Sequence, residues 1–258
     1  MLFINLAQKL KLVNYVEHIG KYFIMLKQVF RKPQKGKVFY EAIFREIEEL
    51  GLKSLGIIMF ISFFIGGVIA LQTALNLDGA FIPQSLIGFA AKRSIILEFA
   101  PTFCSIILAG KVGSYITSSI GTMKVTEQID ALDVMGINSL NYLVLPKIIA
   151  TVFFYPFLII LGMTIGIFGG WLAGVFSGLF SGVDYIEGLR TEFNPFFIVY
   201  ALIKTLVFAF LISTVPSYHG YYVQGGSIAV GKASTQSVVW TTILIVIANY
   251  LLTQMLLT

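Results

Sequence analysis

The sequence has few charged residues and few side chains suited to metal binding or catalysis. Only 12% of its 258 residues are charged, against about 25% in a soluble domain. Cys104 is the only cysteine, so an intrachain disulfide is excluded. The two histidines, His18 and His219, stand alone and have no metal-ligand spacing. We therefore expect no metal site.

The chain also lacks the motifs of nucleotide hydrolysis. The sequence G-x-x-x-x-G-K-[ST] does not occur, because Gly225-Gly226 and Gly231-Lys232 lack its spacing and its Ser or Thr. No nucleophile, histidine and acid can be combined into a defensible catalytic set. We therefore expect a protein that is not an enzyme and holds no cofactor of its own.

Long apolar segments are what the sequence has in abundance. Hydrophobic residues make up 57% of the chain, and the mean hydropathy is +0.87. A bilayer-spanning helix needs about 20 predominantly apolar residues. Five segments meet this length and predict an all-α integral membrane protein: 52–75, 87–118, 142–179, 196–215 and 238–257. The third is overlong, and fits either one tilted, protruding helix or a span with a re-entrant piece.

The first 50 residues differ from the permease-like remainder, 51–258. Ten of the eighteen Lys and Arg precede Ser54, which favours a cytoplasmic N-terminus facing anionic lipid. These residues are spread along a helix and not massed in a block, so nucleic-acid binding is disfavoured. A helical apolar period predicts an amphipathic helix in the membrane interface, or one packed on a soluble partner. Its apolar positions are Leu6, Leu10, Val13, Val16, Ile19, Phe23, Leu26 and Phe30.

Five spans place the two termini on opposite sides of the membrane. With the N-terminus inside, segment 122–141 and a Gly- and Ser-containing loop at 216–237 are expected to be cytoplasmic. Loops 76–85 and 181–195 are then expected outside. Lys92 and Arg93 lie near the outer end of the second span, against the positive-inside rule. Residues that break a rule are candidates for function.

Glu98 is the most informative single residue. A charged side chain inside a span costs roughly 2.5–3.5 kcal/mol on insertion scales and marks a pathway or an ion pair. We expect Lys92 and Arg93 as its neighbours, either around a lipid headgroup or in a structural ion pair. In the first span, Phe64, Leu71 and Gln72 are candidates for lining an acyl-chain cavity, the alternative being lipid-facing or interfacial positions.

Residues 121–136 form a polar segment that is too short and too charged to span. On a helix starting near Thr122, Val125, Ile129 and Leu132 share one side, while Glu127 and Asp130 point away. From this pattern alone, an ordinary solvated surface helix explains the segment as well as a partner-binding helix does.

Glycines recur at three- and four-residue spacing, as between Gly162 and Gly174. Such spacing lets helices approach closely in lipid. The contact is either within one chain or between two copies of it.

Three motifs carry a resemblance to the MlaE family of ABC-transporter permeases. They are Glu98-x-x-Pro101, Ala109-Gly110-Lys111-x-Gly113, and Gly121-Thr122-Met123-Lys124-x-Thr126-Glu127-Gln128-Ile129-Asp130-Ala131-Leu132. Pro146-Lys147 and Gly231-Lys232-Ala233-Ser234-Thr235 follow at the family's distances. The chain departs from the family at three positions: Lys111 replaces a frequent Arg, Ser119 an acidic residue, and Leu97 the Arg that often precedes the Glu.

The resemblance implies roles for two groups of residues. It makes segment 121–136 the coupling helix that sits in a groove of the ATPase, with Thr122, Lys124, Glu127, Gln128, Asp130 and Leu132 as its contact residues. It places Glu98 beside a lipid cavity at the centre of a homodimer, near the outer side, with Lys92, Arg93, Phe64, Leu71 and Gln72 as the candidate lining.

The resemblance also implies a setting and a cargo. The partners would be a second copy of the chain, a cytoplasmic ABC ATPase that binds the ATP, a periplasmic MCE-domain protein and, in some systems, a small cytoplasmic STAS-type regulator. The place would be the bacterial inner membrane and the cargo phospholipid. The alternatives are export of toxic hydrophobic molecules, a non-transporting scaffold, and a membrane-embedded lipid enzyme, which would need a catalytic set that the chain lacks.

Overall fold

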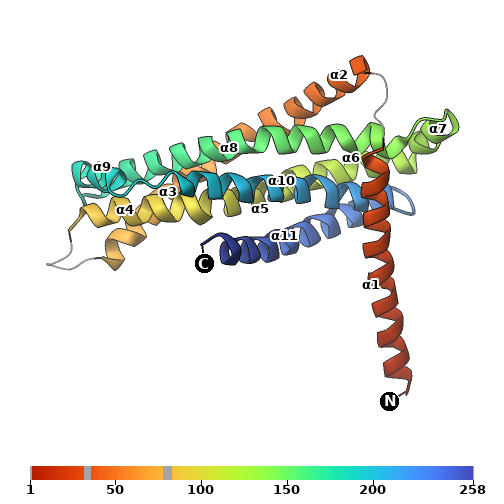
Figure 1. Ribbon diagram of the computed structural model, residues 1–258, viewed down its shortest axis with the longest axis horizontal. Helices are drawn as coiled ribbons and strands as arrows, with labels where there is room; N and C mark the ends of the chain where they lie inside the picture. Colours follow the sequence, from red (N-terminus) through yellow and green to blue (C-terminus); the bar gives the residue numbers. More distant parts are fainter. Residues whose placement is uncertain (1, 32–35, 78–82, 258) are drawn as a thin grey trace.

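The computed structural model describes residues 2–31, 36–77 and 83–257, and for residues 2–15, 37 and 257 the backbone alone. Helices account for the regular structure of this described part (Figure 1). The α-helices are α1 (Leu2–Val29), α2 (Gly36–Glu46), α3 (Leu55–Asn76), α4 (Ser85–Ser94), α5 (Cys104–Leu108), α6 (Ser114–Val125), α7 (Gln128–Val134), α8 (Ser139–Ser177), α9 (Gly182–Arg190), α10 (Phe196–Tyr221) and α11 (Ser227–Leu257). The π-helices η1 (Ile47–Gly51), η3 (Ile95–Phe103) and η4 (Ala109–Gly113) and the 3-10 helix η2 (Leu52–Ser54) join several of them into longer runs.

Five helical runs are long and apolar enough to cross a membrane, as the sequence predicts. They are Val38–Asn76, Ser85–Val125, Ser139–Ser177, Phe196–Tyr221 and Ser227–Leu256. They lie side by side along the long axis of the molecule (Figure 1). Helices α2 and α7 lie at one end of this bundle, and α4 and α9 at the other. The chain is therefore a multi-pass, all-α membrane protein.

The overlong third segment is one continuous helix. Helix α8 has 39 residues, which at 1.5 Å per residue makes it about 58 Å long. The hydrocarbon core of a bilayer is about 30 Å thick. Helix α8 therefore protrudes from the membrane, and the alternative of a re-entrant piece is wrong.

The loop predicted at 216–237 is largely helical. Helix α10 continues to Tyr221 and α11 begins at Ser227. The small polar residues that suggested a loop instead pack these helices on α6: Thr117 Oγ1 lies 3.0 Å from the carbonyl oxygen of Pro216 and 2.7 Å from Ser237 Oγ. Small and hydroxyl-bearing residues serve this purpose between membrane helices. The outer loop expected at 76–85 contains residues 78–82, which lie outside the described residues.

The glycine series joins two helices of the same chain. A Cβ atom on Gly66 of α3 would lie 1.9 Å from the carbonyl oxygen of Gly166, and one on Gly169 would lie 2.1 Å from that of Phe63. Such distances leave no room for a side chain, so α3 and α8 touch backbone to backbone. Because α3 fills this glycine face, it is not a seam between two copies.

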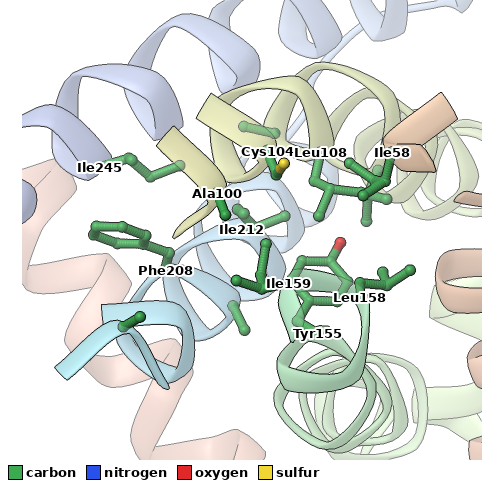
Figure 2. Close-up of a cluster of buried hydrophobic side chains, with 14 of the residues drawn as sticks. Ile58, Ala100, Cys104, Leu108, Tyr155, Leu158, Ile159, Phe208, Ile212 and Ile245 are labelled. Atoms are coloured by element: carbon green, nitrogen blue, oxygen red, sulfur yellow. The ribbon is translucent and has the colours of Figure 1, made fainter. Parts of the chain in front are cut away.

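Apolar side chains from most of the spans meet at mid-bundle (Figure 2). Ile58 of α3, Cys104 of α5, Tyr155 of α8 and Phe208 of α10 are all buried there. Ile245 is buried beside them although α11 is otherwise largely exposed. The core fixes the positions of α5, α10 and α11, which also carry the polar groups described next.

Helix α1 leaves the bundle almost at a right angle (Figure 1). His18 Nδ1 lies 2.7 Å from the hydroxyl of Tyr218, and the hydroxyl of Tyr22 lies 2.7 Å from Thr214 Oγ1. Asn141 Nδ2 donates to the carbonyls of residues 29 and 31, at 2.6 and 2.8 Å. A helix across the spans matches the interfacial helix predicted from the sequence. The side chains of its first predicted apolar positions, Leu6, Leu10 and Val13, lie outside the described residues.

Candidate functional site

A hydrogen-bonded polar cluster lies within the membrane-spanning helices. We call it the Glu98 cluster and define it as Glu98, Thr102, Tyr200, Lys204, Asn249 and Thr253. Its members come from η3, α10 and α11. Three elements distant in the sequence thus bring their polar side chains to a single carboxylate.

An ion pair forms the centre of the cluster. Lys204 Nζ donates to Glu98 Oε1 at 2.7 Å. Asn249 Nδ2 donates to Glu98 Oε2 at 3.1 Å. The hydroxyls of Thr102, Tyr200 and Thr253 lie 3.3 Å from the carboxylate oxygens. Both carboxylate oxygens are therefore hydrogen-bonded, as a charge at membrane depth requires.

The backbone at this point is altered by a proline. Pro101 has no N–H to donate to the carbonyl of Leu97, four residues earlier, so α-helical bonding is interrupted there. The segment Ile95–Phe103 is wound as a π-helix, a form often found at functional sites. Lys204 Nζ lies 3.4 Å from the oxygen of Leu97. Pro101 thus frees a backbone acceptor for the same ammonium that binds Glu98.

The two charges differ in exposure. The side chain of Lys204 is 0% exposed, whereas that of Glu98 is 39% exposed. The carboxylate can therefore meet a ligand while the ammonium behind it stays protein-bound. On the other side of η3, the void against α3 and α8 measures about 10 Å³, which holds roughly one water molecule. An acyl chain does not fit there.

A second group of polar residues lies at the α7 end of the bundle. Helix α6 ends at Val125, and Glu127 adopts a left-handed conformation (φ 60°) before α7 begins at Gln128. Lys124 Nζ bridges the break with a 2.7 Å ion pair to Asp130. The short helix α7 is therefore held at an angle to α6 as a separate element (Figure 1).

Helix α7 exposes apolar side chains. Ile129 is buried and anchors it, but Val134 and Met135 are 89% and 65% exposed. Leu132 lines a cavity of 530 Å³ whose other walls belong to α2 and α8, including Phe39 and Tyr142. An exposed apolar tip beside such a hollow is typical of a protein-binding surface.

A continuous helical run connects the two groups. The run Ser85–Val125 contains η3 with Glu98 and ends at the break before α7. Displacement of α7 would therefore act on the second span, which carries the carboxylate.

Comparison with known proteins decides the family. The model of the permease MlaE family matches residues 43–255. The chain belongs to the MlaE permease family.

Individual relatives agree with this assignment. A probable ABC transporter permease of Rickettsia bellii is 34% identical over 98% of both chains. The intermembrane phospholipid transport system permease MlaE of Haemophilus influenzae is 29% identical over 94% of this chain and 97% of its own length. The chloroplastic protein TRIGALACTOSYLDIACYLGLYCEROL 1 of Arabidopsis thaliana is 31% identical over 89% of this chain and 65% of its own length. As an MlaE-family permease, the chain is a transporter subunit and not an enzyme.

The prediction that Lys92 and Arg93 are the neighbours of Glu98 in this MlaE-family permease is wrong. Lys92 Nζ donates instead to the carbonyls of Leu189 and Thr191, at 3.1 and 2.7 Å. It thereby satisfies backbone oxygens at the end of α9, which otherwise have no helical partner. The guanidinium of Arg93 lies over the ring of Phe197, 5.3 Å from its centre.

The cation that does pair with Glu98 is Lys204, which the sequence analysis did not name. It is the only charged residue between Phe196 and Val215, and this isolation in an apolar segment was the available signal.

The three residues proposed from the first span lie apart from the Glu98 cluster. Phe64, Leu71 and Gln72 belong to α3, which contributes no member to that cluster. Phe64 is 55% exposed and contacts Phe60, with the ring centres 4.8 Å apart. Their role in an acyl-chain cavity stays a prediction.

The coupling segment differs from the single helix predicted over residues 121–136. Thr122 and Lys124 belong to the last turn of α6, and Gln128, Asp130 and Leu132 to α7. Glu127 separates the two helices. The even helical spacing assumed across this segment is thus broken, because a left-handed residue cannot continue a right-handed helix.

Proposed function

We propose that this permease is the membrane subunit of an ABC transporter that moves phospholipids. The Glu98 cluster is the observation that carries the proposal. A paired charge at membrane depth is costly and marks a pathway for a polar group. The name of the Haemophilus influenzae relative, which assigns it to phospholipid transport, supports this cargo.

In the proposed mechanism, the lipid headgroup contacts the exposed part of the Glu98 carboxylate. Lys204 balances the negative charge from the buried side. Asn249 and Thr253 of α11 would exchange their bonds with Glu98 for bonds to the headgroup. Movement of α11 relative to η3 would then alternate between a site that holds the headgroup and one that releases it.

Energy enters at α7, which we propose as the contact for a cytoplasmic ABC ATPase. Its exposed Val134 and Met135 would fill an apolar groove on that partner. Glu127, Gln128 and Asp130, together with Thr122, Lys124 and Leu132, form the surrounding polar and apolar contacts of the surface. Closure of the ATPase would push α7 and, through the run Ser85–Val125, shift Glu98.

The remaining partners and the orientation are part of the same proposal. A second copy is needed because the void beside Glu98 within one chain measures only about 10 Å³. We place the α1 and α7 end in the cytoplasm of a bacterial inner-membrane complex and the α9 end in the periplasm, towards an MCE-domain protein. A STAS-type regulator would bind on the cytoplasmic side.

The proposal is tested by isolating the tagged chain from its native membrane in mild detergent, with mass spectrometry of bound protein and lipid. We expect an ABC ATPase and phospholipid to be recovered. Met135→Glu should lose the ATPase and keep the lipid, whereas Leu179→Glu, an exposed change at the other end of α8, should lose neither. Recovery without any ATPase in several detergents would contradict the transporter, and would favour a scaffold. A bound non-lipid hydrophobic compound in place of phospholipid would favour export of such compounds.

A further inference from the structure

A second charged pocket lies at the α9 end of the bundle, opposite α7 (Figure 1). It has a volume of about 310 Å³. Its walls are Phe89 and Arg93 of α4, residues 192–195 of the connection between α9 and α10, and Phe197 of α10. We call it the Arg93 pocket. It shares no residue with the Glu98 cluster.

The pocket holds one cation whose hydrogen-bonding edge is available. The guanidinium of Arg93 lies 5.3 Å from the ring centre of Phe197 and 6.0 Å from that of Phe89. Stacking on a ring uses the face of a guanidinium, while its N–H groups point outward in the plane. Within the described residues, Arg93 has no recorded hydrogen bond or ion pair. The stacking therefore fixes an arginine fork ready for a phosphate.

The pocket also holds one anion. Glu192 has a left-handed backbone (φ 44°), which is uncommon for a residue other than glycine. In the described part of the chain its carboxylate has no recorded hydrogen bond, and it does not reach Arg93. Its recorded electrostatic neighbour is Lys92, whose ammonium is occupied by the carbonyls of Leu189 and Thr191. A positive and a negative group thus face one pocket without pairing to each other.

We propose that the Arg93 pocket binds the zwitterionic headgroup of a phospholipid with a primary amine. The phosphodiester would accept hydrogen bonds from the edge of Arg93, and the ammonium would donate to Glu192. Phe89 and Phe197 would hold the glycerol end. The proposal rests on phospholipid transport as the function, and names the headgroup class that this site selects.

The two charges give the pocket its selectivity. An anionic glycerol headgroup satisfies Arg93 but meets the unpaired carboxylate of Glu192. A quaternary choline headgroup carries the positive charge but has no N–H to donate. Discrimination between headgroups therefore resides in Glu192, and overall retention resides in Arg93.

The test is native mass spectrometry of the purified chain with an equal mixture of phosphatidylethanolamine and phosphatidylglycerol. Charge-assisted hydrogen bonds support an effect of about tenfold per lost partner. Glu192→Gln should lower the ratio of bound ethanolamine to bound glycerol lipid about tenfold. Arg93→Gln should lower retention of both. The exposed residues Glu187 and Arg190 of α9 do not line the pocket, so Glu187→Gln and Arg190→Gln are the matched controls and should change neither.

Each further arm has a defined meaning. Measurements repeated on Glu98→Gln remove the contribution of the Glu98 cluster and should keep the same ratios. Arg93→Lys, which retains the charge, should retain part of the glycerol lipid, and this separates lost binding from lost folding. Glycerophosphoethanolamine without acyl chains should fail to displace the lipid if the membrane is the source, and displacement would point to a soluble headgroup compound.

The outcomes separate this proposal from the function on which it rests. An unchanged ratio in Glu192→Gln, or unchanged retention in Arg93→Gln, would overturn the Arg93 pocket and leave phospholipid transport standing. A wild-type chain that retains no phospholipid at all would overturn the transport proposal itself.

Discussion

Replacing Lys204 with Met removes the buried cation of the Glu98 cluster and leaves the carboxylate uncompensated. Breaking a fully buried ion pair by removing one partner costs about 3–5 kcal/mol. The side chain of Glu98 is 39% exposed, and solvent screening lowers this to about 2–3 kcal/mol. For a chain of this size we expect the apparent Tm to fall by roughly 4–12 °C.

The second variant of this cycle is the decisive one. In Glu98→Gln/Lys204→Met both charges are gone, so most of the lost thermal stability should return while lipid transport stays abolished. The assay is thermal unfolding in detergent beside transport in proteoliposomes, with the exposed Lys232→Met as control. If the two single changes simply add in the double variant, Glu98 and Lys204 are not coupled and the reasoning fails.

Three further changes test other parts of the structure. Gly169→Ala should lower the apparent Tm by an amount equivalent to about 1–3 kcal/mol, because its Cβ would lie 2.1 Å from the carbonyl oxygen of Phe63; Gly110→Ala, which meets nothing within 4 Å, should not, and equal effects would refute the close helix contact. Glu127→Gly should raise thermal stability by up to about 1 kcal/mol by relieving the left-handed backbone, and a fall in the Tm would contradict this. Met135→Asp should weaken ATPase binding about tenfold, as truncation of an interface anchor does, at unchanged Tm; unchanged binding in a titration would remove Met135 from the interface.

Most of the fold was predictable from hydropathy. Continuous apolar segments locate the five spans, because a bilayer requires about 20 such residues in a row. The ends of the spans were not predictable in the same way. Glycine, serine and proline between 216 and 237 mark a loop in a soluble protein, but in a membrane protein they also mark close helix contacts. Thr117 and Ser237, bonded at 2.7 Å, show why helix won here.

The functional residues were predictable singly and not as a set. Glu98 was identified from the cost of its charge in a span. Its partner depended on which helix packs against η3, and the sequence does not contain that information. Local spacing favoured Lys92 and Arg93, but the long-range contact with α10 supplied Lys204. The break at Glu127 was missed for a related reason, because a left-handed residue other than glycine has no sequence signature.

ATP-dependent transfer of phospholipid, measured in proteoliposomes that hold the assembled transporter, tests the central claim most directly. Glu98→Gln keeps the size of the side chain and removes its charge, and we expect it to abolish transfer while ATPase binding persists. The exposed Glu187→Gln on α9 should transfer lipid at the wild-type rate. Transfer by Glu98→Gln at the wild-type rate would show that the Glu98 cluster is a structural ion pair and not the path of the lipid.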